Sequence, residues 1–166
     1  MKISLVWLII SFVYVIPWCL VAQNSARDYL NAHNAARARV GVAPLVWHSG
    51  LESYARKHLS KFLRTCIPEL ANNELYGENI SSSVDETGHL KEVTGKQVVE
   101  IWVEQKQYYN EETNSCVGGR QCINYIQVVW SDTTHVGCAR VKCYNGSYMV
   151  GCNYRPPAKY LRERPY

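Results

Sequence analysis

The segment Cys116-Val-Gly-Gly-Arg-Gln-Cys122-Ile-Asn124-Tyr-Ile-Gln-Val-Val-Trp130 is the most informative part of the sequence. It begins as a glycine-rich loop between two cysteines and ends as an apolar run that carries amide side chains. A chain that performs acid-base or metal chemistry could be expected to place a histidine at the position of Asn124. An asparagine amide is neutral, a poor metal ligand and no general base. Whether this protein is an enzyme therefore depends largely on Asn124.

The N-terminal segment is typical of a signal peptide. Lys2 precedes the almost uninterrupted apolar stretch Ile3 to Val15, and Ala22 is a small residue of the kind that signal peptidase prefers. A membrane anchor is the alternative, but the stretch is short for about 30 Å of hydrocarbon. We therefore expect residues 1–22 to be removed, and residues 23–166 to form one soluble, secreted domain with no transmembrane segment.

The distribution of charge argues against one class of partner. The 18 basic and 14 acidic side chains are scattered along the chain and form no basic stripe. Nucleic-acid binding requires clustered positive charge, so we expect no nucleic-acid partner.

Six cysteines would remain after the signal peptide, and with it Cys19, is removed. An even number in a secreted chain favours disulfides. Zinc is the alternative, but the sequence contains neither a Cys-x-x-Cys pair nor a paired histidine spacing. The short separation of Cys116 and Cys122 makes them a natural pair, whereas the residues alone leave the pairing of the others open. The six are Cys66, Cys116, Cys122, Cys138, Cys143 and Cys152.

Capping signals and apolar periodicity predict three helices. A capping box at Ser25 opens a helix that ends near Gly41, and its His33 is expected to be a hydrogen-bonded core histidine. A second helix, capped by Ser49, extends to about Leu63. The buried face expected for it comprises Leu51, Tyr54, Ala55, His58, Leu59 and Phe62. His48 and His58 have no acidic or cysteine partner nearby in sequence, so we interpret them as structural or surface residues.

The third predicted helix opens at the capping signature Thr94-Gly-Lys-Gln97 and extends to about Tyr109. One face of it is expected to carry Val98, Ile101, Trp102 and Gln105.

The remaining pattern predicts strands and an irregular tail. A short strand is expected around residues 78–81, and two longer strands at 135–142 and 147–154 form a hairpin across Asn145-Gly146. Residues 155–166 contain three prolines and no helical period, so we expect an irregular tail on the surface.

Four motifs, in this order and at these intervals, resemble the plant pathogenesis-related class 1 proteins of the CAP superfamily. They are Gly77-Glu-Asn79, Gln127-Val-Val-Trp130, Gly137-Cys138 and Cys152-Asn-Tyr154, and all six mature cysteines fall at family positions. The resemblance implies an α+β fold, a three-layer α-β-α sandwich with a small antiparallel sheet. It also implies three disulfides, which pair Cys66 with Cys143, Cys116 with Cys122, and Cys138 with Cys152.

The family's cavity usually presents two histidines and two glutamates, a set that could hold a divalent cation and activate water. This chain keeps one carboxylate, Glu78, but has Gln105 and Asn124 at two of the other positions, and the remaining histidine position falls between Ala71 and Asn73. One carboxylate and two amides do not make a zinc site. We therefore expect a degenerate cavity with no metal, cofactor or catalytic residue, in which the amides hydrogen-bond Glu78 and each other.

The function implied by the resemblance is that of a secreted, non-enzymatic plant defence protein of the apoplast, expected to be a monomer. Its expected ligand is a sterol or other lipid, bound at an aromatic loop with Tyr108, Tyr109 and Tyr125. Ordinary packing explains these tyrosines equally well. A pathogen surface or a plant receptor is a further expected partner. The alternatives are a precursor of a C-terminal signalling peptide, residues 156–166, and a metal-dependent hydrolase, which the donor set disfavours.

Two N-glycosylation sequons occur, at Asn79 and Asn145. We favour Asn145 because a hairpin tip is accessible, whereas an internal hydrogen bond explains Asn79 equally well.

Overall fold

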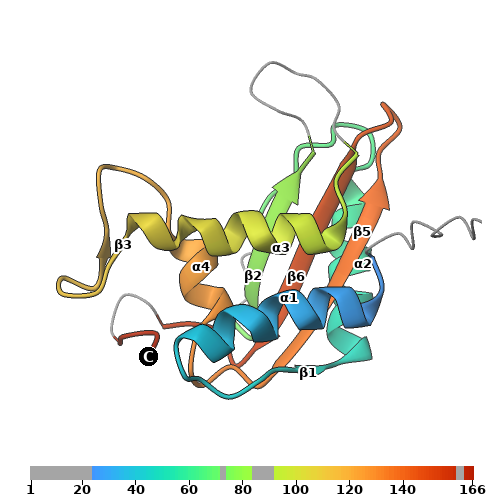
Figure 1. Cartoon of the computed structure of the whole chain (residues 1–166). Helices are drawn as coiled ribbons and strands as arrows, with labels where there is room; N and C mark the ends of the chain where they lie inside the picture. The colour runs from blue at the N-terminus through green and yellow to red at the C-terminus, as the bar shows by residue number, and fades with distance from the viewer. Residues whose placement is uncertain (1–23, 72–73, 84–91, 160–162) are drawn as a thin grey trace, which may run out of the picture.

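The fold is an α+β sandwich of three layers (Figure 1). The computed structural model describes residues 24–71, 74–83, 92–159 and 163–166, so the predicted signal peptide lies outside the described residues. Helices α1 and α3 cover one face of a central sheet and α2 covers the other. The layered architecture implied by the resemblance is confirmed.

The sheet has four strands in the order β1-β5-β6-β2. Its centre is the hairpin of β5 (His135–Lys142) and β6 (Tyr148–Arg155), which pair antiparallel, and β2 (Gly77–Ser82) pairs antiparallel with β6. The predicted hairpin and short strand are confirmed to within one or two residues. The two-residue strand β1 (Val46–Trp47), which pairs parallel with β5, was not predicted because two residues carry no period.

The three predicted helices are present, with different ends. Helix α1 (Ala26–Arg39) begins with both hydrogen bonds of the predicted capping box, and α3 (Gly95–Glu104) does the same at Thr94. Helix α2 (Ser49–Leu59) continues into the 3-10 turn η1 (Ser60–Phe62). Its N-cap is His48, whose Nδ1 accepts a hydrogen bond from the Leu51 amide, so the assignment of Ser49 as the cap was wrong.

A short helix and a two-stranded ribbon, in and beside the informative segment, were not predicted. Helix α4 (Ile123–Val128) has only six residues, too few for an apolar run to show a helical period. Helix α3 ends at Glu104 and tightens into the 3-10 turn η2 (Gln105–Tyr108), followed by a two-stranded ribbon of β3 (Tyr109–Asn110) and β4 (Ser115–Cys116).

The predicted buried face of α3 was wrong in one residue. Ile101 is 50% exposed, whereas Val98, Val99 and Trp102 are buried. At about 100° per residue the stripe is centred between Val98 and Val99, which leaves Ile101 at its outer edge.

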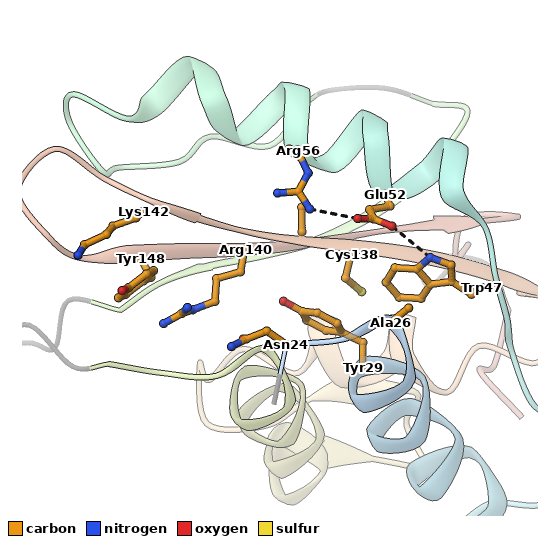
Figure 2. Close-up of a pocket in the computed structure, with 11 residues that line it drawn as sticks. Asn24, Ala26, Tyr29, Trp47, Glu52, Arg56, Cys138, Arg140, Lys142 and Tyr148 are labelled. Atoms are coloured by element: carbon orange, nitrogen blue, oxygen red, sulfur yellow. Dashed lines mark hydrogen bonds and ion pairs between the residues drawn. The ribbon is translucent and has the colours of Figure 1, made fainter. Parts of the chain in front are cut away.

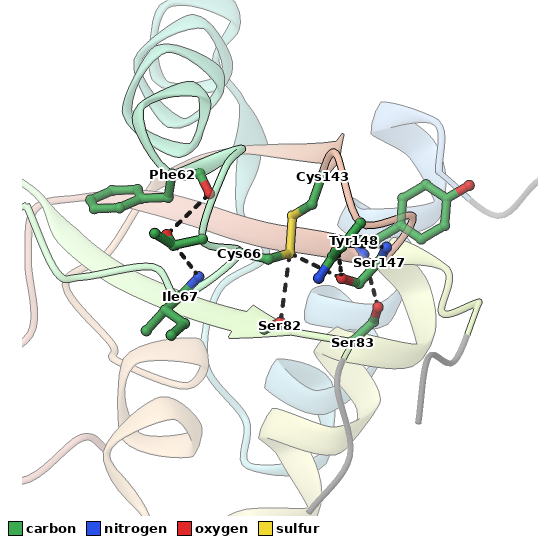
Figure 3. Close-up of a disulfide and its surroundings, with 10 residues drawn as sticks. Phe62, Cys66, Ile67, Ser82, Ser83, Cys143, Ser147 and Tyr148 are labelled. Carbon is green, nitrogen blue, oxygen red and sulfur yellow. Dashed lines mark hydrogen bonds between the residues drawn. A yellow bond between two sulfur atoms is a disulfide. The ribbon is translucent and has the colours of Figure 1, made fainter. Parts of the chain in front are cut away.

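Three disulfides tie these elements together, in the pairing that the resemblance implied. Cys138 and Cys152 lie opposite each other on β5 and β6. Cys66, in the loop after α2, is joined to Cys143 at the hairpin turn (Figure 3). The Ser147 hydroxyl lies 3.3 Å from the Cys66 sulfur. The third disulfide, between Cys116 and Cys122, closes the loop before α4.

One face of α1 carries buried polar side chains into the core. His33 is fully buried, as predicted; its Nδ1 lies 2.8 Å from the Tyr29 carbonyl oxygen and its Nε2 lies 2.8 Å from the Tyr154 hydroxyl. Because a carbonyl only accepts, the proton is assigned to Nδ1, and the Tyr154 hydroxyl donates to Nε2.

Arg37, one turn after His33, is fully buried and was not singled out from the sequence. Its guanidinium donates to backbone carbonyls at 2.6 Å (Ala43), 2.7 Å (Trp130), 3.0 Å (Thr133), 3.1 Å (Val128) and 3.5 Å (Ser131). Among the described residues no carboxylate pairs with it. The spacing of four residues from Tyr29 to His33 to Arg37 places all three on one face and could have identified it.

Candidate functional site

The residues expected to form a degenerate cavity include Glu78, which lies on β2. Its side chain is buried, and its Oε2 accepts a hydrogen bond of 2.7 Å from the Ala71 amide. His58 lies on the neighbouring α2, where its Nε2 is 3.9 Å from Glu78 Oε1 and 2.7 Å from the Glu69 carbonyl oxygen. No acidic neighbour of His58 was evident from the sequence because Glu78 is distant along the chain, but the fold places the two side chains together.

The side chains of Gln105 and Asn124 are not part of the cluster formed by Glu78 and His58. Gln105 is half-buried at the start of η2, and its Oε1 is buried without a hydrogen-bond partner. Asn124 is half-buried on α4, where its backbone oxygen accepts 2.9 Å from Asn79 Nδ2. Among the described ranges, the expected hydrogen bonds between Glu78, Gln105 and Asn124 side chains are not formed. The expected position of a further histidine includes Asn72 and Asn73, which lie outside the described residues.

A divalent metal does not fit the donor atoms that are present. Glu78 supplies one carboxylate, and the nearby His58 already directs Nε2 at a carbonyl oxygen. In the part of the chain that the structure describes, one group of three potential ligands occurs, formed by His33, Cys138 and Cys152. These cysteines form a disulfide, and both His33 nitrogens have hydrogen-bond partners. Neither place offers the three or four free ligands that zinc requires.

The three tyrosines of the predicted lipid loop differ in their surroundings. Tyr109 and Tyr125 are buried, with ring centroids 6.0 Å apart. The Tyr109 hydroxyl donates to Asn114 Oδ1 at 2.8 Å, and that of Tyr125 lies 3.0 Å from the Tyr166 hydroxyl. Tyr108 is half-buried, with the Arg120 guanidinium 5.5 Å from its ring centroid. Tyr109 and Tyr125 are therefore packing residues, and Tyr108 is the one open to a ligand.

The same loop and the residue that follows it present two exposed aliphatic side chains. Val117, inside the loop closed by Cys116 and Cys122, is 40% exposed, and Ile123, which follows the loop and begins α4, is 42% exposed. The Val117 amide donates to the Tyr108 carbonyl at 2.8 Å, which holds this side of the loop against η2. Tyr108 is the last residue of η2, next to this loop, and we call Tyr108, Val117 and Ile123 together the loop patch.

A groove of about 530 Å³ runs between α1 and α3. Its apolar lining is made by Ala32, Ala35, Ala36 and Val103. Its polar lining includes the salt bridge from Lys96 to Glu100, with 2.9 Å between Nζ and Oε1. Small side chains on the facing helices leave this space, which has the size of a small-ligand site.

The described residues after β6, 156–159 and 163–166, form no helix or strand and are attached to the rest of the protein by hydrogen bonds. Gln127 Oε1 accepts from the Ala158 amide at 2.9 Å, and the carbonyl of the buried Pro165 accepts from the Ser131 amide at 2.7 Å. Arg164 donates to the carbonyls of Glu111 and Glu112. The end of the chain is thus attached to α4 and to the turn between β3 and β4.

The two sequons differ in accessibility. Asn79 is fully buried, and its amide donates to the Asn124 carbonyl and to the Tyr154 hydroxyl at 3.2 Å. Asn145 is exposed at the hairpin tip, where its Oδ1 accepts from the Ser147 amide at 3.1 Å. These surroundings favour Asn145, whose glycosylation stays a prediction.

Comparison with known proteins agrees with the resemblance seen in the sequence motifs. The profile of the cysteine-rich secretory protein family, CAP, matches residues 30–154. Pathogenesis-related protein 1B of Nicotiana tabacum is 45% identical over 145 residues, which cover 87% of this chain and 83% of that protein. Pathogenesis-related protein 1 of Arabidopsis thaliana is 40% identical over 152 residues, which cover 92% and 88%.

Solved structures share the fold. Venom allergen-like protein 4 of Schistosoma mansoni is similar with a TM-score of 0.60 at 27% identity, covering 84% of this chain and 92% of that one. NaASP2, solved with Zn²⁺, is similar with a TM-score of 0.60 at 20% identity, covering 83% and 82%. At that identity the likeness to NaASP2 concerns the fold alone. Within the described ranges, no helix is long and apolar enough to cross a membrane.

Proposed function

Because this chain belongs to the CAP family of cysteine-rich secretory proteins, with plant pathogenesis-related class 1 relatives, we propose that it is a secreted, non-enzymatic defence protein that binds a sterol or other lipid. The plant extracellular space is its proposed location, and a monomer its proposed state. A pathogen surface or a plant receptor is its proposed macromolecular partner.

The loop patch is the observation that carries the lipid proposal. Val117 offers apolar surface on a loop that the Cys116–Cys122 disulfide already fixes, and Ile123 on α4 and Tyr108 on η2 add apolar surface beside it. A fixed loop loses little conformational freedom when a ligand binds, so most of the favourable burial of apolar surface, about 25 cal/mol per Å², is retained. A sterol needs such a surface and a contact for its one hydroxyl, and it needs no metal.

The groove between α1 and α3 is a second place where an apolar ligand could lie. Its alanine-rich lining suits a flexible acyl chain, and Lys96 in its polar lining suits an anionic headgroup. We favour the loop patch for a sterol because a rigid ring system gains most from a flat, preformed surface.

The decisive experiment is a titration of the secreted protein with a fluorescent sterol. We expect saturable binding that falls at least tenfold when both Val117 and Ile123 are changed to Ser. Val46→Ser is the matched control, because Val46 is an exposed valine on β1, in a different part of the fold. Tyr109 is unsuitable for this test because its burial means that substitution would damage the fold.

A second variant distinguishes sterol binding at the loop patch from sterol binding in the groove. Ala32→Trp fills the groove and leaves the loop patch unchanged, so sterol affinity should stay the same. Absence of saturable sterol binding by the unaltered protein would refute the lipid proposal. Binding that only Ala32→Trp weakens would move the site to the groove.

The two alternatives have less support. Release of residues 156–166 would break the contacts of Ala158, Pro165 and Tyr166 with the rest of the protein. Mass spectrometry of secreted material that shows cleavage after Arg155 would establish the peptide precursor. A metal-dependent hydrolase is disfavoured because Glu78, Gln105 and Asn124 do not provide its ligands.

A further inference from the structure

We propose that a second pocket, at the start of α1 and lined by different residues from the groove, binds a small oxyanion, such as a carboxylate, sulfate or phosphate group. The pocket has a volume of about 270 Å³ and lies between the start of α1, α2 and β5 (Figure 2). The residues that argue for a ligand are Asn24, Tyr29, Arg140 and Lys142, which line it together with Trp47, Glu52 and Arg56.

The strongest observation is a buried hydroxyl without a partner. Tyr29 is 2% exposed, and its hydroxyl has no hydrogen-bond partner in the part of the chain that the structure describes. Figure 2 shows its ring projecting from α1 into the pocket, with the hydroxyl on the side where Asn24 and Arg140 lie. An unpaired buried hydroxyl is costly, so a ligand oxygen at this point would satisfy it.

Gly95 makes this position of the hydroxyl possible. A Cβ at Gly95 would overlap the end of the Tyr29 ring, so the absence of a side chain lets the ring lie against the start of α3. The Gly95 amide donates to Asn24 Oδ1 at 2.7 Å. This bond fixes the Asn24 side chain at the pocket and leaves its Nδ2 as a donor.

Arg140 supplies the second unsatisfied group. Its side chain is 16% exposed and lies over the Tyr148 ring, with 3.4 Å from the guanidinium carbon to the ring centroid. Its Nε is buried and has no partner. Its ion pair with Glu92 spans 3.6 Å, and Glu92 is 79% exposed, so this contact is weak. The guanidinium is therefore rigidly placed and largely available to an anion.

The charge balance of the pocket is positive. Glu52 is the one acid in the lining, and its carboxylate already accepts from Arg56 at 3.1 Å and from Trp47 Nε1 at 3.3 Å. Arg140 and Lys142 thus remain as positive charges facing the pocket.

The protonation of Tyr29 agrees with a donor role. Burial raises the pKa of Tyr29 to about 12, although Arg140 and Arg56 act in the opposite direction. The hydroxyl therefore keeps its proton near neutral pH and can donate it to an anionic oxygen.

The size and lining restrict the ligand. A pocket of about 270 Å³ is slightly smaller than the sites that hold drug-sized molecules. It suits one acidic group on a small body, such as an acidic sugar, which could contact the aromatic rings of Tyr29 and Trp47. Carboxylate, sulfate and phosphate share the chemistry that the donors recognise.

The test is isothermal titration calorimetry of the secreted protein with sodium galacturonate, sodium sulfate and sodium phosphate. Sodium chloride sets the same ionic strength in each titration. We expect saturable binding of at least one anion, and the ranking of the three identifies the acidic group. Tyr29→Phe should weaken this binding at least about tenfold, because a hydrogen bond to a charged group is lost. Arg140→Gln should weaken it by as much or more.

Two matched controls separate a local site from general charge effects. Tyr144→Phe removes an exposed hydroxyl, and Lys61→Gln makes the same change in net charge as Lys142→Gln at an exposed position of η1. Both controls should leave the affinity unchanged, whereas Lys142→Gln should lower it. The far-ultraviolet circular dichroism of Tyr29→Phe should match that of the unaltered protein, which shows that the fold is kept.

Two results would overturn the proposal. One is the absence of saturable binding by all three anions. The other is binding that Tyr29→Phe and Arg140→Gln leave unchanged, which would place the anion elsewhere.

Discussion

The two ends of α1 bury polar groups in opposite ways. Near its C-terminal end, the Arg37 guanidinium is surrounded by backbone carbonyls, and one turn earlier both His33 nitrogens are bonded. Near its N-terminal end, the Tyr29 hydroxyl and the Nε of Arg140 on the adjacent β5 find no hydrogen-bond partner within the described ranges. All of these groups are well buried, so burial alone does not distinguish them.

What differs is the number of hydrogen bonds, and this number separates structural roles from binding roles. A buried group with all its bonds formed stabilises one arrangement of the chain. A buried group without them lowers stability, so its presence calls for another explanation, such as a ligand. On this criterion the Arg37 end of α1 is structural and the Tyr29 end is a binding site.

The largest effect is expected from Arg37→Met. This change removes the donors of at least four backbone carbonyls while nearly keeping the side-chain volume. We expect the free energy of unfolding to fall by about 3–5 kcal/mol, because the buried carbonyls lose their partners. Urea denaturation measures it. Arg39→Met, at an exposed position of the same helix, should change it by less than about 0.5 kcal/mol. A loss below about 1 kcal/mol for Arg37→Met would contradict the structural role.

The second largest effect is expected on the stability of the protein when the pH is lowered. Burial lowers the pKa of His33 from 6.5 to about 4, against the opposing effect of the hydrogen bond to Tyr29. Above pH 6.5 this histidine is neutral in both states, and its contribution is constant. As the pH falls from 6.5 to about 4, the unfolded state binds the proton first, so the protein loses about 3 kcal/mol of stability from this group. Below about pH 4 the loss is complete.

Urea titrations at several pH values, on the unaltered protein and on His33→Gln, isolate this contribution. The variant lacks the titrating ring, so its stability should depend less steeply on pH between 6.5 and 4. Equal slopes for the two proteins would show that His33 does not titrate in this way.

The smallest effect on the free energy of unfolding is expected when one of two buried tyrosine hydroxyls is removed. Tyr154→Phe removes bonds to His33 and Asn79 and should lower the free energy of unfolding by about 1–2 kcal/mol. Tyr29→Phe removes an unpaired hydroxyl and should leave stability unchanged or raise it by about 1 kcal/mol. Thermal and urea unfolding of both variants, in buffer free of oxyanions, provide the comparison. If Tyr29→Phe is destabilised as much as Tyr154→Phe, the two ends of α1 do not differ as described.

Local signals explain which parts of the fold were predictable. The capping boxes at Ser25 and Thr94 and the turn at Asn145-Gly146 act over a few residues, so the sequence shows them directly. The six-residue α4 and the two-residue β1 are too short for any period, and tertiary packing determines them. The cap of α2 was misassigned because a histidine rarely takes that role.

The candidate sites were less predictable because they join distant segments. The sequence shows amides, Gln105 and Asn124, at two positions where the resemblance implies metal ligands, whereas it does not show the approach of His58 to Glu78. The anion pocket brings together residues from 24–29, 47–56 and 138–148. No spacing along the chain relates Tyr29 to Arg140, and only the fold shows that the Tyr29 hydroxyl and Arg140 Nε find no hydrogen-bond partner among the described residues.

The attachment of the C-terminal tail has a consequence for any proteolytic processing of this protein. Cleavage after Arg155 would cut the backbone but would leave the contacts of Ala158, Pro165 and Tyr166 in place. The cut protein would therefore keep the fragment as a non-covalently bound ligand, and its release would follow a dissociation rate separate from the rate of cleavage. The same contacts would make the emptied surface a receptor for that fragment, so that the protein could recapture its own C-terminus.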